Sequence, residues 1–592
     1  MSKKIFVVIF IGLLKSLYSQ NITYYIHNRP DSLKLYSAPD SLGHKISLKK
    51  ASTNNTIQLP YPILLIHGLG SNDQTWNNFT NIIDTMYNLN FGGRIDVCLN
   101  HDGDVSVANL NYSNTSSADI AFFTSLNDLS IGDYYTLNFD VGRFGSVYPT
   151  SSSSDYVLSN QAAIYKQGVA VKYAIDLILQ KTGKSKAVLL GHSMGGLASR
   201  QYIQNSNLWL FPAQQDGHRV GKLATTGTPH GGSNVSGGVL TVLFSPLSEY
   251  SEAVRDLRTS YLYSGDPGVF LFGGLEDPNV IDDHLIGNFH NLDVNCNGVL
   301  NDNIQGLNSK PLPNNIHYAC VVGNCSGCYY YSGGDGVVLY NSADLGNFYN
   351  VPYLEKFVYN TFAFTEIHTT LPSLFDFNMK ALDEPDSTRL SYAVNTNTPY
   401  LAFITPQTDT ISGIDLDAFT FTLNNNYLVT IKAFDIKVHN LGFKLYNSSG
   451  NQINSNIYSN GLDSIIQNII LTPGQYYIVF EDSVKPSDYY KSYKFILKTS
   501  TPTDIYSNLN SKITIFPNPA EDRISILGVN ASQKIQFEIS DITGRIVVQN
   551  ELKSQDDLIS IDISNIPSGF YFLKLFEPST GLIIHESKFI KN

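Results

Sequence analysis

The chain has few charged residues for its length. Asp, Glu, Lys and Arg make up 15% of the 592 residues, the net charge is −12, and no block of basic residues is present. Binding to nucleic acid requires clustered Lys and Arg, so nucleic acid is not an expected partner. After residue 20, no stretch reaches 18 consecutive apolar residues. We therefore do not expect an integral helical membrane protein.

Cysteine is also scarce, with only five residues: Cys98, Cys296, Cys320, Cys325 and Cys328. An odd number leaves at least one thiol unpaired within a monomer. The spacing from Cys320 to Cys328 fits a structural disulfide, and it also matches the start of one iron–sulfur pattern. We expect a disulfide because the chain begins with an export signal. No cofactor is required by the chemistry inferred below.

The first 20 residues have the three parts of a secretory signal peptide. Lys3 and Lys4 give a basic start, residues 5–14 are apolar, and a short polar stretch follows. This segment is too short to span a membrane as a mature anchor. We expect export and removal of residues 1–20.

Residues 25–382 show the alternation of an α/β domain. Short, continuously apolar runs at 62–69, 134–140, 187–193, 219–229 and 316–323 alternate with helix-like segments such as 160–181. Apolar runs without a polar face indicate strands covered on both sides by helices. The pattern predicts a doubly wound, mostly parallel sheet.

The rest of the chain has the period-two pattern of β-structure. Residues 390–500 predict an accessory β-sandwich, which resembles modules appended to secreted bacterial hydrolases. A polar linker at 501–512 precedes a last all-β unit at 513–592. This unit contains FPNP, DITGR, GFYFLKL and a terminal KFIK. In these blocks it resembles the C-terminal sorting domain of the type IX secretion system of Bacteroidota. The resemblance implies type IX machinery as a partner and delivery to the cell surface or outside.

The stretch KAVLLGHSMGG at 186–196 has the features of a nucleophile elbow. An apolar strand leads into Gly191-His-Ser193-Met-Gly195, and a helix can begin at Met194. The glycines remove side chains that a sharp turn would crowd, and the helix N-terminus favours negative charge near Ser193. We predict that Ser193 is a catalytic nucleophile.

Two further blocks support a hydrolase. His67-Gly68-Leu69-Gly70 follows an apolar strand, and TTGTPHGG at 225–232 follows the strand after the elbow. These blocks resemble the oxyanion loop and the GTPH segment of secreted lipases, and the hydrolase domain of GPI inositol-deacylases. The resemblance implies that the backbone N–H groups of Leu69 and Met194 bind an oxyanion. It also implies supporting roles for His67, in the loop, and for His230, in the cleft wall.

The acid and base of such a triad follow the nucleophile along the chain. Asp335 lies in a glycine-rich turn that resembles the acid loop of bacterial lipases, with Asp344 or Glu366 as the alternatives. His368 follows an apolar strand and is the one histidine in the required place. The triad predicts a serine hydrolase of carboxylic esters, with a lipid or other ester as substrate. An amide hydrolase, an acyltransferase or an inactive surface-binding protein are the alternatives.

The segment at 231–315 is an insertion that predicts either a lid over an acyl pocket or a buried subdomain. It contains Asp293-Val-Asn295-Cys-Asn297-Gly298, the opening of a calcium loop. Because Ile304 stands where a glutamate is expected, such a structural calcium site would need Asp302. The calcium site of bacterial triacylglycerol lipases uses an Asp two residues after the histidine, where this chain has Thr370.

Overall fold

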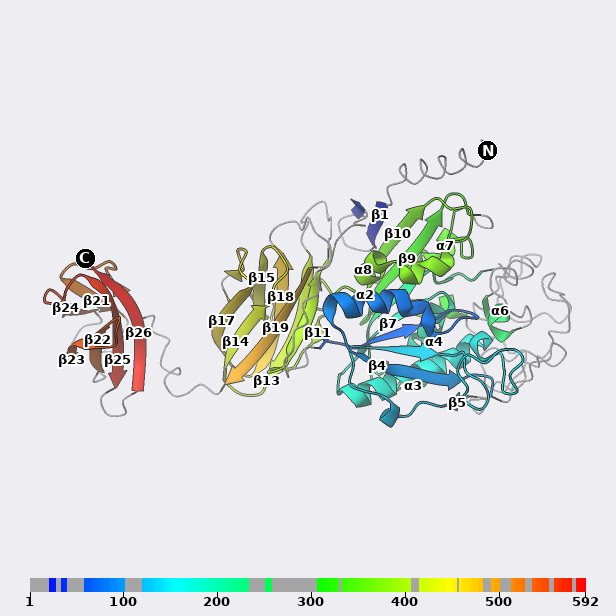
Figure 1. Ribbon diagram of the computed structural model, residues 1–592, viewed down its shortest axis with the longest axis horizontal. Helices are drawn as coiled ribbons and strands as arrows, with labels where there is room; N and C mark the ends of the chain where they lie inside the picture. Colours follow the sequence, from blue (N-terminus) through cyan, green and yellow to red (C-terminus); the bar gives the residue numbers. More distant parts are fainter. Residues whose placement is uncertain are drawn as a thin grey trace, which may run out of the picture. The chain divides into compact units, whose positions relative to one another are not determined.

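The structure is a computed structural model (Figure 1). It describes residues 21–27, 34–39, 58–101, 120–233, 251–257, 306–328, 333–405, 415–454, 457–482, 491–500, 513–527, 535–552, 558–577 and 582–592. The predicted signal peptide, the linker 501–512 and most of the insertion 231–315 lie outside these residues. The chain divides into two compact units. One comprises residues 1–422, 431–467 and 474–498, and the other comprises 423–430, 468–473 and 499–592.

A ten-stranded sheet forms the centre of the N-terminal domain. Its order is β2 (Lys34–Pro39), β1 (Asn21–His27), β10 (Leu354–Thr361), β9 (His317–Cys325), β8 (Val220–Thr226), β7 (Ala187–His192), β3 (Ile63–Ile66), β6 (Tyr134–Asn138), β4 (Phe91–Cys98) and β5 (Ala121–Phe122). The seven strands from β10 to β4 are parallel, and the other three pair antiparallel at the edges. The predicted doubly wound, mostly parallel sheet is therefore confirmed, although β1 begins four residues before the expected boundary at 25.

Helices cover both faces of this sheet. On one face, α3 (Ile164–Thr182) and α4 (Met194–Gln204) share a core with inward side chains such as Leu64 and Leu189. On the other face, α2 (Asn77–Tyr87) and α8 (Phe375–Leu382) lie near Ile63 and Val188. Consecutive strand residues thus face opposite helix layers, which is why the strands are apolar throughout.

The described part of the predicted insertion comprises residues 231–233, α6 (Glu252–Leu257) with Ser251, and residues 306–315 with the short 3-10 helix η8 (Leu307–Ser309). The α6 carboxylates cap α3: Glu252 accepts a hydrogen bond from the Ala163 N–H at 2.8 Å, and Asp256 accepts one from the Ile164 N–H at 2.9 Å. These N–H groups have no partner within their own helix, so the acids of α6 satisfy and charge-stabilise its N-terminus. The insertion is therefore joined to the core of the hydrolase domain at this point.

The predicted accessory sandwich has two sheets. One sheet has the order β11 (Tyr392–Ala393), β13 (Leu416–Leu423), β18 (Gly474–Asp482), β15 (Leu441–Asn447) and β16 (Ile457–Tyr458). The other has the order β12 (Pro399–Ile404), β19 (Lys491–Ser500), β14 (Tyr427–Phe434) and β17 (Ser464–Leu471). Between the sheets, the ring of Phe480 lies within 6.0 Å, centroid to centroid, of Phe419, Tyr493 and Phe495. Aromatic packing therefore holds this small domain together.

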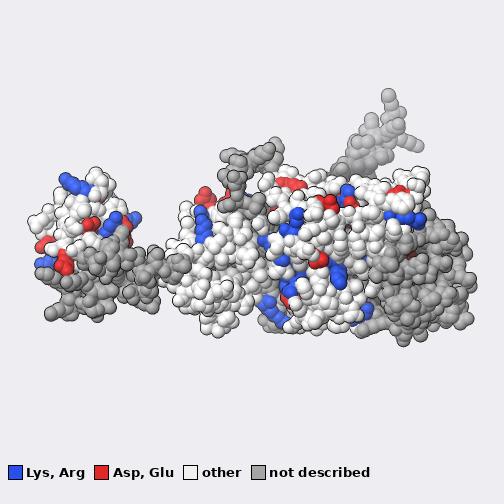
Figure 2. All heavy atoms as spheres, turned by 90° about the horizontal axis from the view of Figure 1, so that it is seen from below, with Lys and Arg blue, Asp and Glu red and all other residues white. Residues whose placement is uncertain are grey.

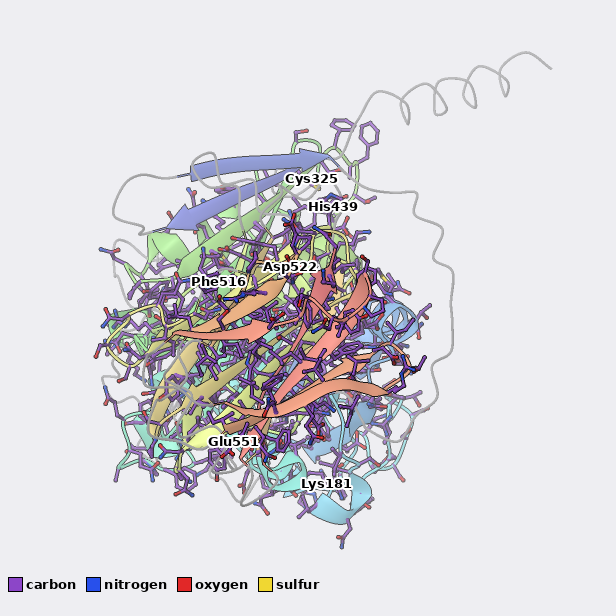
Figure 3. The ribbon with its side chains drawn as sticks, turned by 90° about the vertical axis from the view of Figure 1, so that its left-hand side faces the viewer. Lys181, Cys325, His439, Phe516, Asp522 and Glu551 are labelled. Carbon is purple, nitrogen blue, oxygen red and sulfur yellow. A yellow bond between two sulfur atoms is a disulfide. The ribbon has the colours of Figure 1, made fainter. Side chains whose placement is uncertain are left out.

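The C-terminal unit contains a second sandwich (Figure 3). One sheet comprises β20 (Thr514–Phe516), β21 (Arg523–Leu527) and β24 (Leu558–Asp562). The other comprises β23 (Ile546–Leu552), β22 (Ile535–Asp541), β25 (Gly569–Glu577) and β26 (Leu582–Lys591). The N–H of Asn592 donates to Ala520 O at 2.9 Å, and the Ala520 N–H donates to Ile590 O at 2.7 Å. The end of the chain is therefore tied to the loop that follows FPNP.

Charged side chains are sparse and scattered on the face shown in Figure 2. This agrees with the low charge content of the sequence. Among the described residues, no helix is both long and apolar enough to cross a membrane.

Candidate active site

Ser193 lies in a sharp turn between β7 and α4. Its backbone φ of 51° and ψ of −125° are unusual for a residue with a side chain, and the serine is 9% exposed. The Ser193 N–H donates to Thr226 O at 2.9 Å, which ties the turn to the end of β8. A strained backbone held by its neighbours is typical of a functional position, and this one has the strand–turn–helix form predicted for the elbow.

The glycines around Ser193 allow backbone segments to approach closely. A Cβ added at Gly191 would lie 2.5 Å from Gly196 N, and one added at Gly195 would lie 2.5 Å from Ile66 O. A Cβ at Gly68 would lie 2.7 Å from the Ser193 Cβ. All three distances are too short for a side chain, so the elbow and the loop after β3 require glycine here.

Asp335 and His368 form a buried hydrogen-bonded pair. His368 Nδ1 donates to Asp335 Oδ2 at 2.7 Å, while Asp335 Oδ1 accepts from the N–H groups of Val337 at 2.9 Å and Val338 at 2.7 Å. The backbone holds the same two residues together, because Asp335 O accepts the His368 N–H at 3.2 Å. Both carboxylate oxygens are satisfied, which fixes the orientation of the imidazole.

The pair also shifts the protonation equilibrium of His368. Burial disfavours the imidazolium, but the charge and hydrogen bond of Asp335, with a contribution from Glu366, outweigh it and raise the pKa of His368 above its ordinary value. A carboxylate beside an imidazole makes it a stronger base. This is the effect that a general base acting on a serine needs.

The two alternative acids have other hydrogen-bond or ion-pair partners. Asp344 forms an ion pair with Lys356, with an Oδ2–Nζ distance of 2.8 Å. Glu366 is bonded to its neighbour Thr369, whose N–H donates to Oε2 at 2.9 Å. Thr370, which stands where the lipase calcium ligand would be, donates its hydroxyl to Ile367 O at 2.6 Å. Of the three candidate acids, the structure brings Asp335 to His368.

His192 connects the elbow to this pair. Its Nε2–H donates to the His368 carbonyl oxygen at 3.1 Å, and the two imidazole rings are 4.8 Å apart. Burial, together with the nearby charge of His368, lowers the pKa of His192 well below its ordinary value. His192 is therefore a neutral donor that holds the backbone of His368 next to the Ser193 turn, a contact that no local sequence pattern predicts.

The Ser193 hydroxyl itself makes no hydrogen bond to any of the residues that the structure describes. Contacts between a nucleophile and its base are commonly long when no substrate is bound. The structure thus brings His368 to the elbow through His192, without a direct Ser193–His368 hydrogen bond.

The loop after β3 places Leu69 against α4. Leu69 packs against a buried cluster that contains Met194 and Leu197 of α4 and Ala253 and Leu257 of the insertion. Within the described ranges, neither the Leu69 N–H nor the Met194 N–H donates to a protein acceptor. Two backbone donors without partners beside the serine are what an oxyanion site requires.

His67 stabilises this loop through two hydrogen bonds to the backbone. Its Nδ1–H donates to Gly68 O at 2.9 Å, and its Nε2 accepts the Phe139 N–H at 2.9 Å. Burial, only partly offset by the Gly68 hydrogen bond, lowers the pKa of His67 to about 4. The imidazole is neutral and both ring nitrogens are hydrogen-bonded to the backbone, so His67 supports the loop structurally.

His230 lies deeper than expected. It is fully buried, its Nε2 is 3.1 Å from Thr225 Oγ1, and its Nδ1 is 3.3 Å from Arg200 Nη1. Its ring lies between α4 and β8, where these contacts place it below the loop that follows β8. Its role in the cleft wall stays a prediction.

Two predictions involving metals and thiols have separate outcomes. Cys325 and Cys328 form a disulfide, while Cys320 is a free thiol buried in the core below α3 and α4. The disulfide engages two of the three cysteines in the Cys320–Cys328 spacing. Cys296 and the candidate calcium residues Asp293, Asn295, Asn297 and Asp302 lie outside the described residues.

Comparison with known families matches two segments of the chain. Residues 60–284 match the PGAP1-like alpha/beta domain, and residues 514–591 match the secretion system C-terminal sorting domain. The chain contains a PGAP1-like α/β-hydrolase domain. It also carries a type IX sorting domain, which directs secretion to the cell surface or outside. No curated protein matches the chain.

Solved structures with similar parts are distant in sequence. A gene product of Listeria innocua is 15% identical, with 56% of this chain and 96% of that chain covered and a TM-score of 0.29. The pre-peptidase C-terminal domain of a collagenase from Bacillus anthracis is 18% identical, with 20% of this chain and 99% of that chain covered and a TM-score of 0.16. A DUF3244 family protein from Bacteroides vulgatus with an immunoglobulin-like β-sandwich fold is 24% identical, with 14% of this chain and 86% of that chain covered and a TM-score of 0.12.

Proposed function

We propose that the protein is a secreted serine hydrolase that cleaves carboxylic esters, with acyl lipids as its substrate class. The observation that carries the proposal is the buried His368–Asp335 hydrogen bond of 2.7 Å, next to a strained serine turn. The match of the hydrolase domain to a PGAP1-like family supports a hydrolase. The lipid substrate rests on the resemblance of the sequence blocks to lipases and inositol-deacylases.

In the proposed mechanism, His368 removes the proton of Ser193 as the serine oxygen attacks the ester carbonyl. Asp335 keeps the proton on Nδ1 before the reaction and stabilises the imidazolium that forms. The N–H groups of Leu69 and Met194 bind the negative oxygen of the tetrahedral intermediate. His368 then protonates the leaving alcohol, and water releases the acyl group from Ser193 by the same steps.

The test combines a covalent probe with a substrate series. A fluorophosphonate should label the wild-type protein but not Ser193→Ala, and hydrolysis of p-nitrophenyl esters should fall by roughly 10⁴-fold or more in that variant. Activity rising with acyl chain length would support a lipid substrate, whereas equal activity for short and long chains would contradict it. Purified wild-type protein that the probe does not label would contradict a serine hydrolase altogether.

A further inference from the structure

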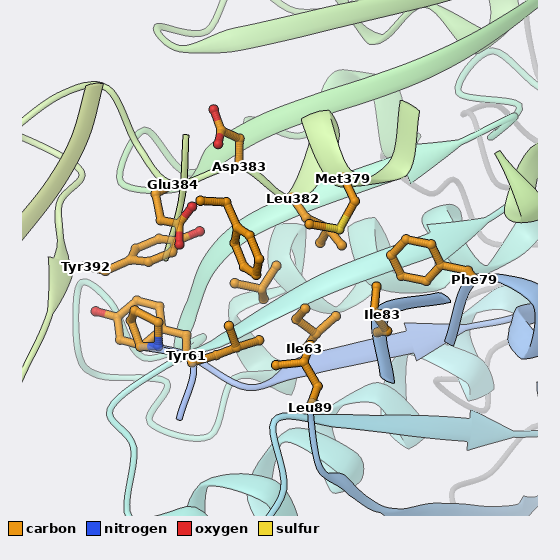
Figure 4. A pocket seen from close by; sticks show the side chains of 14 residues that line it. Tyr61, Ile63, Phe79, Ile83, Leu89, Met379, Leu382, Asp383, Glu384 and Tyr392 are labelled. Atoms are coloured by element: carbon orange, nitrogen blue, oxygen red, sulfur yellow. The ribbon is translucent and has the colours of Figure 1, made fainter. Parts of the chain in front are cut away.

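Four buried carboxylates gather where the hydrolase domain meets the sandwich. Asp383 and Glu384 directly follow α8, and Asp415 and Asp417 lie at the start of β13. None is more than 4% exposed. Figure 4 shows Asp383, Glu384 and Tyr392 at one end of a cavity that is otherwise mostly apolar. The cavity is lined by the first residues of β3 and β7, so it lies at the opposite end of these strands from Ser193.

Hydrogen bonds satisfy only part of this group. Thr405 donates its hydroxyl to Asp383 Oδ2 at 2.9 Å and its N–H to Asp415 Oδ2 at 2.7 Å, and the Tyr493 hydroxyl donates to Asp417 Oδ2 at 2.6 Å. Among the described residues, one buried oxygen of each carboxylate has no partner, namely Asp383 Oδ1, Glu384 Oε2, Asp415 Oδ1 and Asp417 Oδ1. A buried carboxylate oxygen without a partner is strongly unfavourable. Four such oxygens in one group indicate a ligand that supplies positive charge.

The neighbouring lysine Lys222 has other partners. Lys222 Nζ is 3.4 Å from Glu355 Oε2 and donates to the Asp383 carbonyl oxygen at 2.6 Å, so it is already engaged. Lys222 is therefore not a partner of any of the four carboxyl oxygens that lack one.

The positions of the carboxylates fit metal coordination. Two groups, Asp383–Asp386–Asp415 and Asp383–Glu384–Asp417, each bring three ligand oxygens within 4.8 Å of one another. Oxygens bound to Ca²⁺ lie roughly 2.3–2.6 Å from the ion, so two of them are at most about 5 Å apart. Asp383 belongs to both groups and is the centre of the arrangement.

We propose that these five carboxylates form a calcium site centred on Asp383. Every ligand in the two groups is a carboxylate oxygen, which excludes the nitrogen and sulfur ligands that zinc prefers. Mg²⁺ keeps several of its waters, whereas Ca²⁺ accepts many protein oxygens in variable geometry. The ligands come from the end of the hydrolase domain and from the first long strand of the sandwich. The ion joins these two segments and offsets their repulsion.

This site contains none of the residues of the calcium loop predicted at Asp293. It also does not depend on the proposed enzymatic function, because its residues lie at the other end of the strands from Ser193. Its effect should therefore be measured as calcium binding and thermal stability rather than as ester hydrolysis.

The experiment uses the full chain, stripped with EGTA and then titrated with CaCl2 or MgCl2. Wild type should bind Ca²⁺ in calorimetry, and saturating Ca²⁺ should raise its melting temperature by about 5 °C or more. Mg²⁺ should give less than a third of that shift. Asp383→Asn and Asp417→Asn should weaken calcium binding at least tenfold and remove most of the shift.

Two control variants complete the design. Asp435→Asn removes a carboxylate of the same sandwich that pairs with Lys437 at 2.7 Å and Lys494 at 2.6 Å, and it should keep the full response. Asp293→Asn should keep it as well. In EGTA, Asp383→Asn should melt no lower than wild type, because the substitution removes one of several repelling charges. Wild type that neither binds nor responds to Ca²⁺ would overturn the proposal, as would loss of the response in Asp293→Asn but not in Asp383→Asn and Asp417→Asn.

Discussion

The two ends of the parallel strands carry different kinds of buried charge. At the carboxyl ends, the Asp335 carboxylate has hydrogen-bond donors at both oxygens and one basic partner, His368. At the opposite ends, Lys222, His317 and Glu355 stand at the starts of β8, β9 and β10. Beyond them lies the carboxylate group around Asp383, in which four buried oxygens have no hydrogen-bond partner among the described residues.

This difference separates reactivity from stability. A fully paired carboxylate orients one imidazole and needs nothing from outside, which suits a catalytic group. Buried charges at the other end hold structural elements together. If one partner of such an ion pair is removed, the remaining charge stays buried without a partner, which destabilises the fold. Substitutions at the two ends should therefore affect different measurements.

The largest effect should come from Asp335→Asn. The amide cannot hold His368 as a base, so kcat should fall by about 10⁴-fold while the melting temperature changes little. The measurement is steady-state hydrolysis of a p-nitrophenyl ester. Asp344→Asn and Glu366→Gln are matched controls that should retain activity within about threefold; if one of them loses activity instead, the acid has been assigned to the wrong residue.

The opposite behaviour is expected for Glu355→Gln. Burial alone would raise the pKa of Glu355, but Lys222 and His317 lower it to about 2, so the carboxylate is charged and paired. Its loss leaves Lys222 buried without its carboxylate, and the hydrolase domain should lose roughly 3–5 kcal/mol of stability. Denaturant unfolding measures this, and kcat/KM per folded molecule should stay unchanged. A large loss of kcat/KM with normal stability would contradict the proposed difference between the two ends of the parallel strands.

A smaller effect is expected for Gly68→Ala. The added Cβ would lie 2.7 Å from the Ser193 Cβ, so the loop must move and Leu69 loses its position. Loss of one oxyanion donor costs about 10²-fold in kcat. Gly183→Ala is the control, since its Cβ meets nothing within 4 Å although its φ is 67°. It should cost about 1 kcal/mol of stability and leave kcat unchanged.

The smallest effect concerns pH. His368 acts as a base only when neutral, and its pKa is raised above the ordinary value of 6.5. Activity should therefore fall as the pH drops through this raised pKa, with half of the maximal kcat/KM at a pH above 6.5. In Asp335→Asn the residual activity should titrate at a lower pH, because the carboxylate no longer favours the imidazolium. A pH profile of kcat/KM with the same midpoint in both proteins would contradict the coupling.

Local patterns predicted the elements of the fold well. The strand–turn–helix at Ser193 was predictable because its glycines, its strand and its helix are all within eleven residues. β1 was missed, because its pairing with β10 joins residues more than 300 positions apart. The choice among Asp335, Asp344 and Glu366 also depends on contacts between separate segments. Each stands near the end of a predicted strand, and only the fold brings one of them to His368.

The sequence by itself determined the order of the domains, the secretion signal at the C-terminus and the turn that holds the candidate nucleophile Ser193, because each depends on residues that are close together in the chain. Only the tertiary structure decided the partner of His368, the burial of His230 and the contact from His192 to His368. It also gathered Asp383 and Glu384 with Asp415 and Asp417. Energies of buried charges depend on distances between side chains from distant segments, and those distances exist only in the folded chain.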